Sequence, residues 1–538
     1  MPKSLMNRRT LLKSSALLAL CGGAGLKTSL SRAQTSDQKY LFVIAASGGA
    51  NILDSFLPIA DSNFAIESGV VRHNANNVLQ PTLNAGGTCA LRCVEYGSIP
   101  ALNYKGGTVQ RQFLERHGQD VALMTQTGTS VNHIVAAKRS LNGAGNINRG
   151  RTLMEAMAMQ YASDQMVLPN CNMTQGGYNE NGDDPSIPSF ARAETIANPL
   201  LFPLATHSTK GVFQAARAAP LEAETPENFF QRCRRLRAEL DEESVFHQTF
   251  RNTKVTTEFL ERRESVVPLM EDAELIKNLL LVDDTAGDFN LGDYGLSPNE
   301  TFLSDVYGNS NGIFTMDDMM RDAFMSQAAL AYLLARSGSS VAVAISPKAS
   351  VNLVPEGELN PGAQYEFINT PLAFDFSHTN HFTTQNVMWD RILGMTDALI
   401  SLLKSTPLAS GTMWDKSLIY IATEFGRSKQ TGPISGQGSF GTGHELNNGT
   451  ILVSPMLNGN QIYGGVLGLD APAERQGLTY GFDENGESGG SIKDEDVYSG
   501  ANIKREEHVY ATICKTLGIE GDSQSEIDAL AQDCMIKA

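Results

Sequence analysis

Short runs of apolar, often β-branched residues recur along the chain and predict the strands of a central sheet. The clearest runs are 40–46, 121–127, 340–346 and 417–423. An amphipathic stretch over 314–336 predicts a helix that leads directly into the third run. Because a helix followed closely by a strand is typical of parallel, doubly wound sheets, we expect an α/β fold. A mostly parallel central sheet would then be flanked by helices.

Other stretches predict what covers and extends this sheet. Helical periodicity is found over three further stretches: 151–161, 385–403 and 505–517. Residues 226–285 have charged faces, few glycines and apolar residues at helical spacing, which predicts a helical insertion. Residues 60–110 and 347–371 lack periodicity and predict loop insertions. We expect residues 34–538 to form one large domain with these insertions.

The N-terminus has the pattern of an export signal. Arg8 and Arg9 precede an apolar core that is followed by small residues, and Ser31-Arg32-Ala33 offers a cleavage site. A twin arginine at this position predicts the twin-arginine export pathway, with an ordinary secretory signal as the alternative. No later apolar run approaches the ~20 residues that a membrane span requires. We therefore expect residues 1–33 to be a signal peptide and the protein to be periplasmic or extracellular.

The net charge limits the classes of binding partner, and the cysteines allow disulfides. The chain has 42 Lys and Arg against 59 Asp and Glu, a net charge of −17. The signal segment contributes six basic residues and no acidic ones, so the mature chain carries 36 − 59 = −23. This charge disfavours nucleic acid and anionic membranes, and an anionic substrate would need a locally positive site. Six cysteines follow the signal core, and disulfides are permitted in that compartment, but their pairing does not follow from the sequence.

Charged side chains follow the predicted strand at 417–423. Glu424 and Arg427 come directly after run 417–423, and a Gly-rich loop then leads to His444. Ligands of open α/β sheets bind beyond the carboxyl ends of the strands, which is where these residues are expected. A local Glu–Arg ion pair and a loop histidine are the alternative.

The turn after run 121–127 predicts an anion site or a nucleophile. Thr129 and Ser130 precede a predicted helix that contains His133. A helix N-terminus after a short turn favours anions, and either hydroxyl is a candidate nucleophile. Plain capping of the helix by Thr129 or Ser130 is the alternative.

Oxygen and nitrogen ligands also gather in two other segments. Gly48 and Gly49 allow a tight turn after the first strand, where Asn51 or Asp54 could supply an oxygen ligand. Residues 374–381 contain Asp375, His378 and a second histidine within eight positions. Imidazole with a nearby carboxylate suits a divalent transition metal, and a polar loop is the alternative.

Taken together, these pieces resemble the twin-arginine-exported family filed as domain of unknown function fifteen-oh-one. That family is similar to the alkaline phosphatase and sulfatase superfamily. The resemblance is carried by the following pieces: Arg8-Arg9, Gly48-Gly49, His133, His378, Thr423-Glu424-Phe425-Gly426-Arg427, Gly441-Thr442-Gly443-His444, Gly464-Gly465 and Tyr510-Ala511-Thr512. It implies an alkaline-phosphatase-like core with one or two divalent ions held by Asp and His at the strand ends, beside a hydroxyl nucleophile.

The chain departs from the family pattern at several carboxylates. Asn51 stands where the family usually has Asp, Asn132 where it has Ser, and Gly443 where it has Asp before the histidine. The usual Asp-x-His is Phe376-Ser377-His378 here, with Asp375 one place away. Fewer anionic ligands give less compensation for a divalent ion.

Two functions fit these observations. In the first, the protein is a metal-dependent hydrolase of small phosphate or sulfate esters. Its assigned residues are metal ligands His133, His378, His444, Glu424, Asn51 and Asp375, nucleophile Ser130 or Thr129, and anion-binding Arg427. In the second, the protein is a catalytically degenerate relative that acts as a periplasmic or surface binding or assembly protein with a protein partner. The hydrolase would bind metal and turn over esters, and these two measurements distinguish it from the binding protein.

Overall fold

The computed structural model describes twelve parts of the chain: 38–95, 108–162, 166, 168–196, 324–336, 338–347, 350–352, 366–368, 373–431, 440–487, 502–521 and 524–537. The predicted signal peptide and the predicted helical insertion over 226–285 lie outside these residues. So do residues 96–107 of the 60–110 segment and most of the 347–371 segment.

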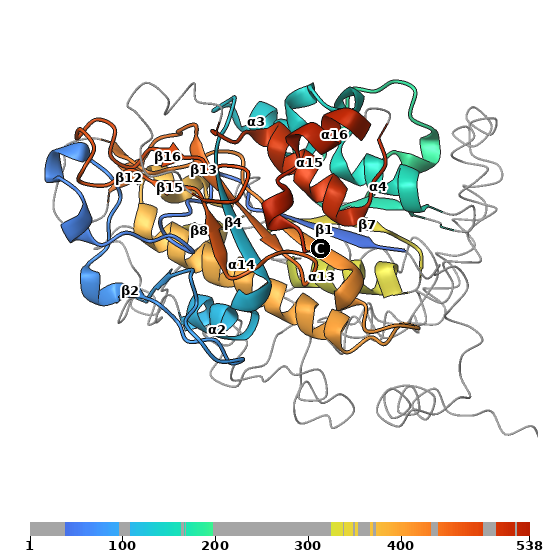
Figure 1. Cartoon of the computed structure of the whole chain (residues 1–538), viewed down its shortest axis with the longest axis horizontal. Helices are drawn as coiled ribbons and strands as arrows, with labels where there is room; N and C mark the ends of the chain where they lie inside the picture. The colour runs from blue at the N-terminus through green and yellow to red at the C-terminus, as the bar shows by residue number, and fades with distance from the viewer. Residues whose placement is uncertain are drawn as a thin grey trace, which may run out of the picture.

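An eight-stranded sheet forms the centre of the molecule (Figure 1). Its strand order is β14-β4-β13-β10-β1-β7-β5-β6. The strands span Tyr40–Ala45 (β1), Val121–Thr127 (β4), Asn170–Asn172 (β5), Glu194–Thr195 (β6), Ala342–Ile345 (β7), Ser417–Ala422 (β10), Asn447–Val453 (β13) and Gln461–Tyr463 (β14). Strand β13 runs antiparallel to both of its neighbours, whereas the remaining pairings are parallel. The expected α/β class with a mostly parallel sheet is confirmed, and the antiparallel β13 was not anticipated.

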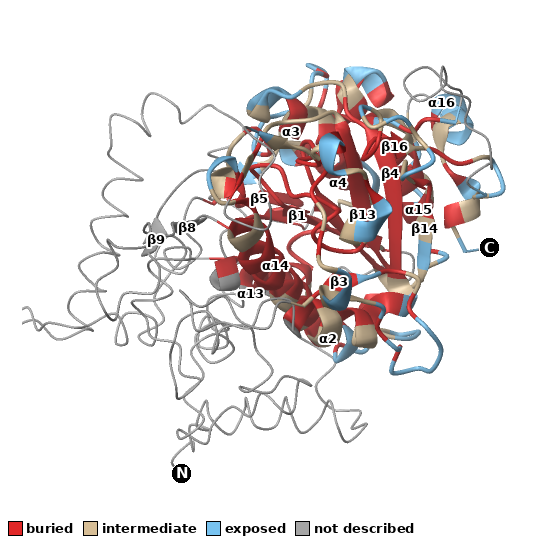
Figure 2. Ribbon diagram, turned by 90° about the vertical axis from the view of Figure 1, so that its left-hand side faces the viewer, coloured by how far each residue is buried: buried red, intermediate tan, exposed pale blue. Residues whose placement is uncertain are grey.

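Helices cover both faces of the sheet. Their bounds are Thr108–His117 (α2), His133–Asn142 (α3), Leu153–Tyr161 (α4), Phe324–Arg336 (α13), His381–Lys404 (α14), Glu506–Leu517 (α15) and Gln524–Leu530 (α16). The alternating side chains of β1 enter two different cores. Phe42 and Ile44 pack in one core with residues of α2, α13 and α14, while Leu41 and Val43 pack in the other with residues of α3, α4 and α15. Both faces are therefore apolar, and the six inner strands are buried along their whole length, whereas the edge strands β6 and β14 are partly exposed (Figure 2).

The carboxyl ends of β1, β4 and β10 lie at the same edge of the sheet. Strands β1 and β10 pair in parallel, with Ala45 opposite Ala422. Strand β4 points the same way, because it is antiparallel to β13 and β13 is antiparallel to β10. The short 3-10 helix η11 (Asp375–His378) joins this edge, since Phe374 N donates to Ser47 O at 2.9 Å. Segments far apart in the sequence thus meet where ligands are expected.

Three local details bear on the sequence-based expectations, and the first corrects one of them. Helix α3 begins at His133, and the Asn132 side chain caps it by accepting from Val135 N, so neither Thr129 nor Ser130 is the cap. The cysteines among the described residues are all unpaired: Cys89, Cys93, Cys171, Cys514 and Cys534. Within the described part of the chain, no helix combines the length and apolarity needed to cross a bilayer.

The sheet core predicts a strong contrast between two isoleucines. Ile419 of β10 is 0% exposed, whereas Ile66, in the loop-rich segment after β1, is 65% exposed. Ile419→Ala should lower the free energy of unfolding by about 2–5 kcal/mol, because it removes buried methyl groups and leaves a cavity. The same substitution at Ile66 should change it by no more than about 0.5 kcal/mol. Denaturant unfolding of both variants checks this, and equal effects would contradict the assigned core.

Candidate metal centre

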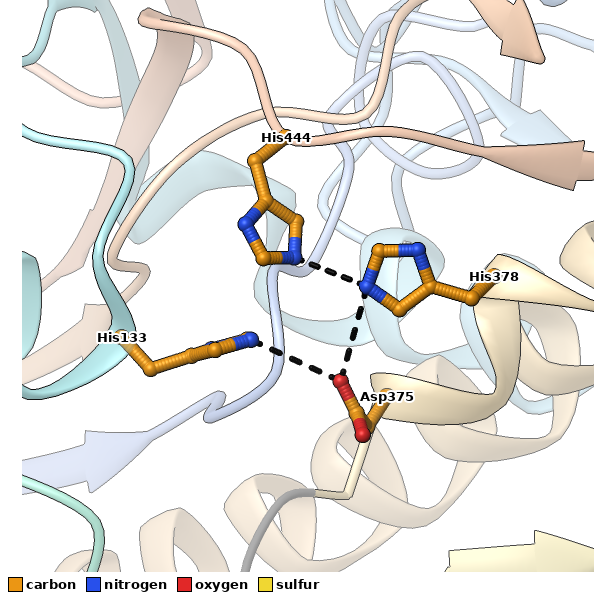
Figure 3. A group of neighbouring side chains, drawn as sticks. All are labelled: His133, Asp375, His378 and His444. Atoms are coloured by element: carbon orange, nitrogen blue, oxygen red, sulfur yellow. Dashed lines mark hydrogen bonds and ion pairs between the residues drawn. The ribbon is translucent and has the colours of Figure 1, made fainter.

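Four side chains converge at the sheet edge: His133, Asp375, His378 and His444 (Figure 3). Each offers one ligand atom, and these four atoms lie within 4.8 Å of one another. His133 is the first residue of α3, and His444 follows the short strand β12 (Gly441–Thr442). Asp375 and His378 begin and end η11, so a spacing of three residues places both on one face of a single turn. The three histidines that the sequence placed far apart are neighbours in space.

The distances between the ligand atoms suit a small divalent ion. His378 Nε2 lies 2.8 Å from His444 Nε2, and Asp375 Oδ1 lies 3.5 Å from His133 Nε2. Asp375 Oδ1 is also 3.8 Å from His378 Nε2. Two ligands of a tetrahedral zinc ion are about 3.3 Å apart, so the group needs only small adjustments to hold one. A set of imidazoles with one carboxylate is a donor set that transition metals accept.

Hydrogen bonds to the opposite ring nitrogens orient two of the histidines. His133 Nδ1 lies 2.5 Å from Glu424 Oε1, and His444 Nδ1 lies 3.0 Å from Val131 O. A backbone carbonyl can only accept, so Nδ1 of His444 carries the proton and Nε2 presents its lone pair to the group. The same tautomer of His133 follows from donation to an ionised Glu424. Metal-binding histidines usually have such partners, which fix the ring and its tautomer.

Glu424 lies behind His133, one layer below the metal-binding atoms. Its side chain is 0% exposed, and Oε1 also accepts from Gly48 N at 2.8 Å. Burial raises the pKa of Glu424, while its hydrogen bond with His133 acts in the opposite direction. The sequence placed Glu424 at the correct edge as a direct ligand. In the structure it is absent from the four-residue group and orients His133 instead.

Arg427 is buried as well, so it does not contact solvent where an anionic substrate would arrive. Its Nε donates to Gly48 O at 2.8 Å, and its NH1 donates to Thr442 O at 3.1 Å. Its NH2 lies 3.7 Å from Asp375 Oδ1. Burial lowers the pKa of Arg427 to about 10, which leaves it cationic at neutral pH. Arg427 therefore places a fixed positive charge behind the metal group, rather than binding the anion directly as the sequence suggested.

Partial burial and this positive charge keep His378 and His444 neutral. Burial and then Arg427 lower the pKa of His378, and the same two causes lower the pKa of His444 to about 4. Neutral imidazole is the form that binds metals, so no proton has to be displaced from these rings at pH 7.

The two candidate nucleophiles have different surroundings. The Thr129 hydroxyl donates to Glu506 Oε1 at 2.8 Å and accepts from Arg139 NH1 at 3.0 Å. Both hydrogen bonds of the Thr129 hydroxyl are therefore made to other parts of the fold, helices α15 and α3. Ser130 Oγ accepts from Asn132 N at 3.1 Å, and no described residue accepts its proton. Neither hydroxyl has a hydrogen bond to the metal group among the described residues, and only Ser130 is left with a proton to share.

Asn51 belongs to a second, fully buried polar group rather than to the metal group. Its Nδ2 donates to Asp54 Oδ2 at 2.6 Å, and the same oxygen lies 2.8 Å from His381 Nε2. Asp54 Oδ1 lies 3.4 Å from His73 Nε2. Burial raises the pKa of Asp54, but the interactions with His381 outweigh it and hold that pKa below its ordinary value. This group is an internal hydrogen-bonded cluster around a buried carboxyl, and its members come from loop 70–73, the β1 turn and helix α14.

The second group also supports the metal group. His381 Nδ1 lies 2.8 Å from Thr442 Oγ1, and the carbonyl of Thr442 accepts from Arg427. His378 and His444, on the two connected segments, are thereby held against each other. No sequence pattern marked His73, because it lies in an irregular loop and becomes relevant only through its long-range contact with Asp54.

The buried Glu424 yields a prediction on metal affinity. Glu424→Gln keeps a side chain of the same shape but removes the negative charge that fixes the His133 tautomer. Zinc affinity should fall about 10–100-fold, which is typical for loss of such an orienting partner. Competition titration with a zinc chelator measures it. Glu507→Gln, on helix α15, serves as the control and should leave the affinity unchanged, and an unchanged Glu424→Gln would contradict the assigned role.

Comparisons with known proteins do not assign the chain to a family. No family model matches the chain, and no curated protein or solved structure matches it either. The resemblance to the alkaline phosphatase and sulfatase superfamily therefore stays an expectation. Function has to be argued from the site, because a fold alone does not determine it.

Proposed function

We propose that this protein is an exported, metal-dependent hydrolase of small phosphate or sulfate esters. The observation that carries the proposal is the group of His133, Asp375, His378 and His444, whose ligand atoms lie within 4.8 Å of one another. The site is accessible, since the side chains of His378 and Asp375 are 42% and 45% exposed. The expected twin-arginine signal supports export, a route that carries folded proteins.

Some residues of the site would hold a metal ion, and others orient these ligands or supply positive charge. His133, Asp375, His378 and His444 would hold the ion, while Glu424 and the Val131 carbonyl orient two of the rings. A divalent ion bound there supplies Lewis-acid polarisation of the ester and lowers the pKa of water. Arg427 contributes positive charge to a strongly acidic protein at the place where an anionic ester would bind. Ser130 remains the candidate nucleophile.

A binding protein without turnover is the second candidate, and two observations favour it. The Thr129 hydroxyl is committed to Glu506 and Arg139, and the Arg427 side chain is buried. Two of the three residues that the sequence suggested for catalysis are therefore withdrawn from a substrate. Bound metal together with no hydrolysis of any phosphate or sulfate ester would establish this alternative.

The metal group predicts a joint loss of ion and activity in one variant. His444→Ala removes a metal-binding nitrogen, so zinc affinity and ester turnover should each fall at least ~100-fold. Elemental analysis of the purified protein and assays with aryl phosphate and aryl sulfate esters measure the two quantities. His508→Ala, on helix α15, is the matched control and should retain both. Wild-type protein that folds well and carries no metal after loading would refute the proposal.

The two hydroxyls predict different outcomes for turnover. Ser130→Ala should reduce turnover at least ~100-fold without changing zinc affinity, because the side chain is a candidate nucleophile and makes no described contact with the metal group. Thr129→Ser, which retains the hydroxyl that bonds Glu506, should leave turnover nearly unchanged. Steady-state kinetics of both variants checks this. Full activity of Ser130→Ala would exclude Ser130 as nucleophile and leave direct attack by water.

A further inference from the structure

A pocket of about 530 Å³ lies beside helices α15 and α16, which pack against each other (Figure 1). Its lining comes from three segments of the chain, within residues 483–484, 502–508 and 529–533. None of the lining residues belongs to the metal group. The volume is within the range of small-molecule sites, and most of the lining residues are polar, so their charges decide which ligand fits.

Lys504 places a buried positive charge in the wall of this pocket. The residue is 6% exposed, and its ammonium lies 4.6 Å from the centre of the Phe482 ring. Among the described residues, none accepts a hydrogen bond from this ammonium and none is in ion-pair contact with it. Burial lowers the pKa of Lys504, so its charge is not fully compensated by the surrounding protein. An anionic group in the pocket would supply the missing partner.

Two carboxylates line the same pocket where it is more exposed. Asp483 is half-buried and Glu484 is exposed. Asp483 Oδ1 accepts from Asn485 N and Glu487 N, both at 2.9 Å, which fixes the turn that carries both carboxylates. Neither carboxylate forms an ion pair with a described residue. Both are therefore available to a cationic group of a ligand.

The other ionisable groups of the lining are neutral or already paired. His508 is a neutral ring, because burial and then Lys504 lower its pKa to about 4. Asp533 Oδ1 lies 2.7 Å from Lys515 Nζ, so this carboxylate has its cation. The pocket thus offers one buried cation and, toward solvent, two carboxylates. A simple anion would be repelled by the two carboxylates, whereas a molecule that carries both signs of charge complements the whole lining.

We propose that this pocket binds a small zwitterion of the amino-acid or dipeptide class, with its carboxylate at Lys504 and its ammonium toward Asp483 and Glu484. This site is additional to the metal group and does not depend on the proposed hydrolase function. The ligand carboxylate would pair the buried ammonium, and the ligand ammonium would stay near solvent, where its desolvation costs less.

Three forms of one dipeptide test this inference without metal or turnover. Alanyl-alanine, its N-acetyl derivative and its C-terminal amide are titrated calorimetrically into the full chain at pH 7. The unmodified dipeptide should bind at least about tenfold more tightly than either derivative, because each derivative leaves one set of charged groups without its partner. In Lys504→Met, which keeps an unbranched apolar side chain next to Phe482, the dipeptide and its amide should bind equally well.

Matched variants separate the two ends of the ligand. The double variant Asp483→Asn, Glu484→Gln keeps the side-chain shapes and should remove the advantage of the dipeptide over its N-acetyl derivative. Lys537→Met, which alters an exposed lysine outside the pocket lining, should preserve every ratio. Cooperative thermal unfolding confirms that each variant is folded.

The possible results distinguish this inference from its competitors. Equal affinities for the three ligands, or no measurable binding of the dipeptide, would overturn it. An N-acetyl derivative that binds as tightly as the dipeptide would assign the pocket to simple carboxylates and overturn the zwitterion. An octyl or zinc-dependent effect plays no part in these titrations, so the hydrolase proposal stands or falls separately.

Discussion

Gly48 joins the two buried charges on which the site depends. Its N–H donates to Glu424 Oε1 at 2.8 Å, and its carbonyl accepts from Arg427 Nε at 2.8 Å. The residue has φ +98°, and a Cβ there would lie 2.7 Å from the backbone nitrogens of Phe374 and Asp375. Because β1 pairs in register with β10, the turn after β1 arrives directly beside Glu424 and Arg427. The pairing of β1 with β10 therefore fixes the positions of Glu424 and Arg427 through Gly48, where the close approach and the positive φ require glycine.

The site is built in two layers of opposite character. His378 and Asp375 are open to solvent, while Glu424 and Arg427 below them are fully buried. Buried charges are costly unless they are paired and hydrogen-bonded. Here each has defined partners: Gly48 and His133 for Glu424, and Gly48 and Thr442 for Arg427. Such an arrangement fixes the exposed side chains before any ligand binds, which favours a binding or catalytic role over a purely structural one.

Sequence patterns found what depends on local order and missed what depends on distant contacts. The runs that became β1, β4 and β10 are continuous and apolar because these strands are buried on both faces. The rule that ligands bind beyond the carboxyl ends of the strands placed Glu424, Arg427 and His444 at one edge of the sheet. It could not distinguish His444, which belongs to the metal group, from the buried Glu424 and Arg427 beneath that group. Helix α14 begins at His381, four residues before the predicted start. The apolar pattern missed this first turn because it is largely polar, and His381 there is a buried partner of Asp54.

X-ray absorption spectroscopy of the zinc-loaded full chain tests the central claim most directly, because it reports the atoms that surround the ion. The arrangement of His133, Asp375, His378 and His444 predicts a first shell of nitrogen and oxygen, with the outer-shell scattering that imidazole rings produce. The imidazole signal should weaken in His444→Ala. A spectrum without imidazole scattering, or with sulfur in the first shell, would contradict the account.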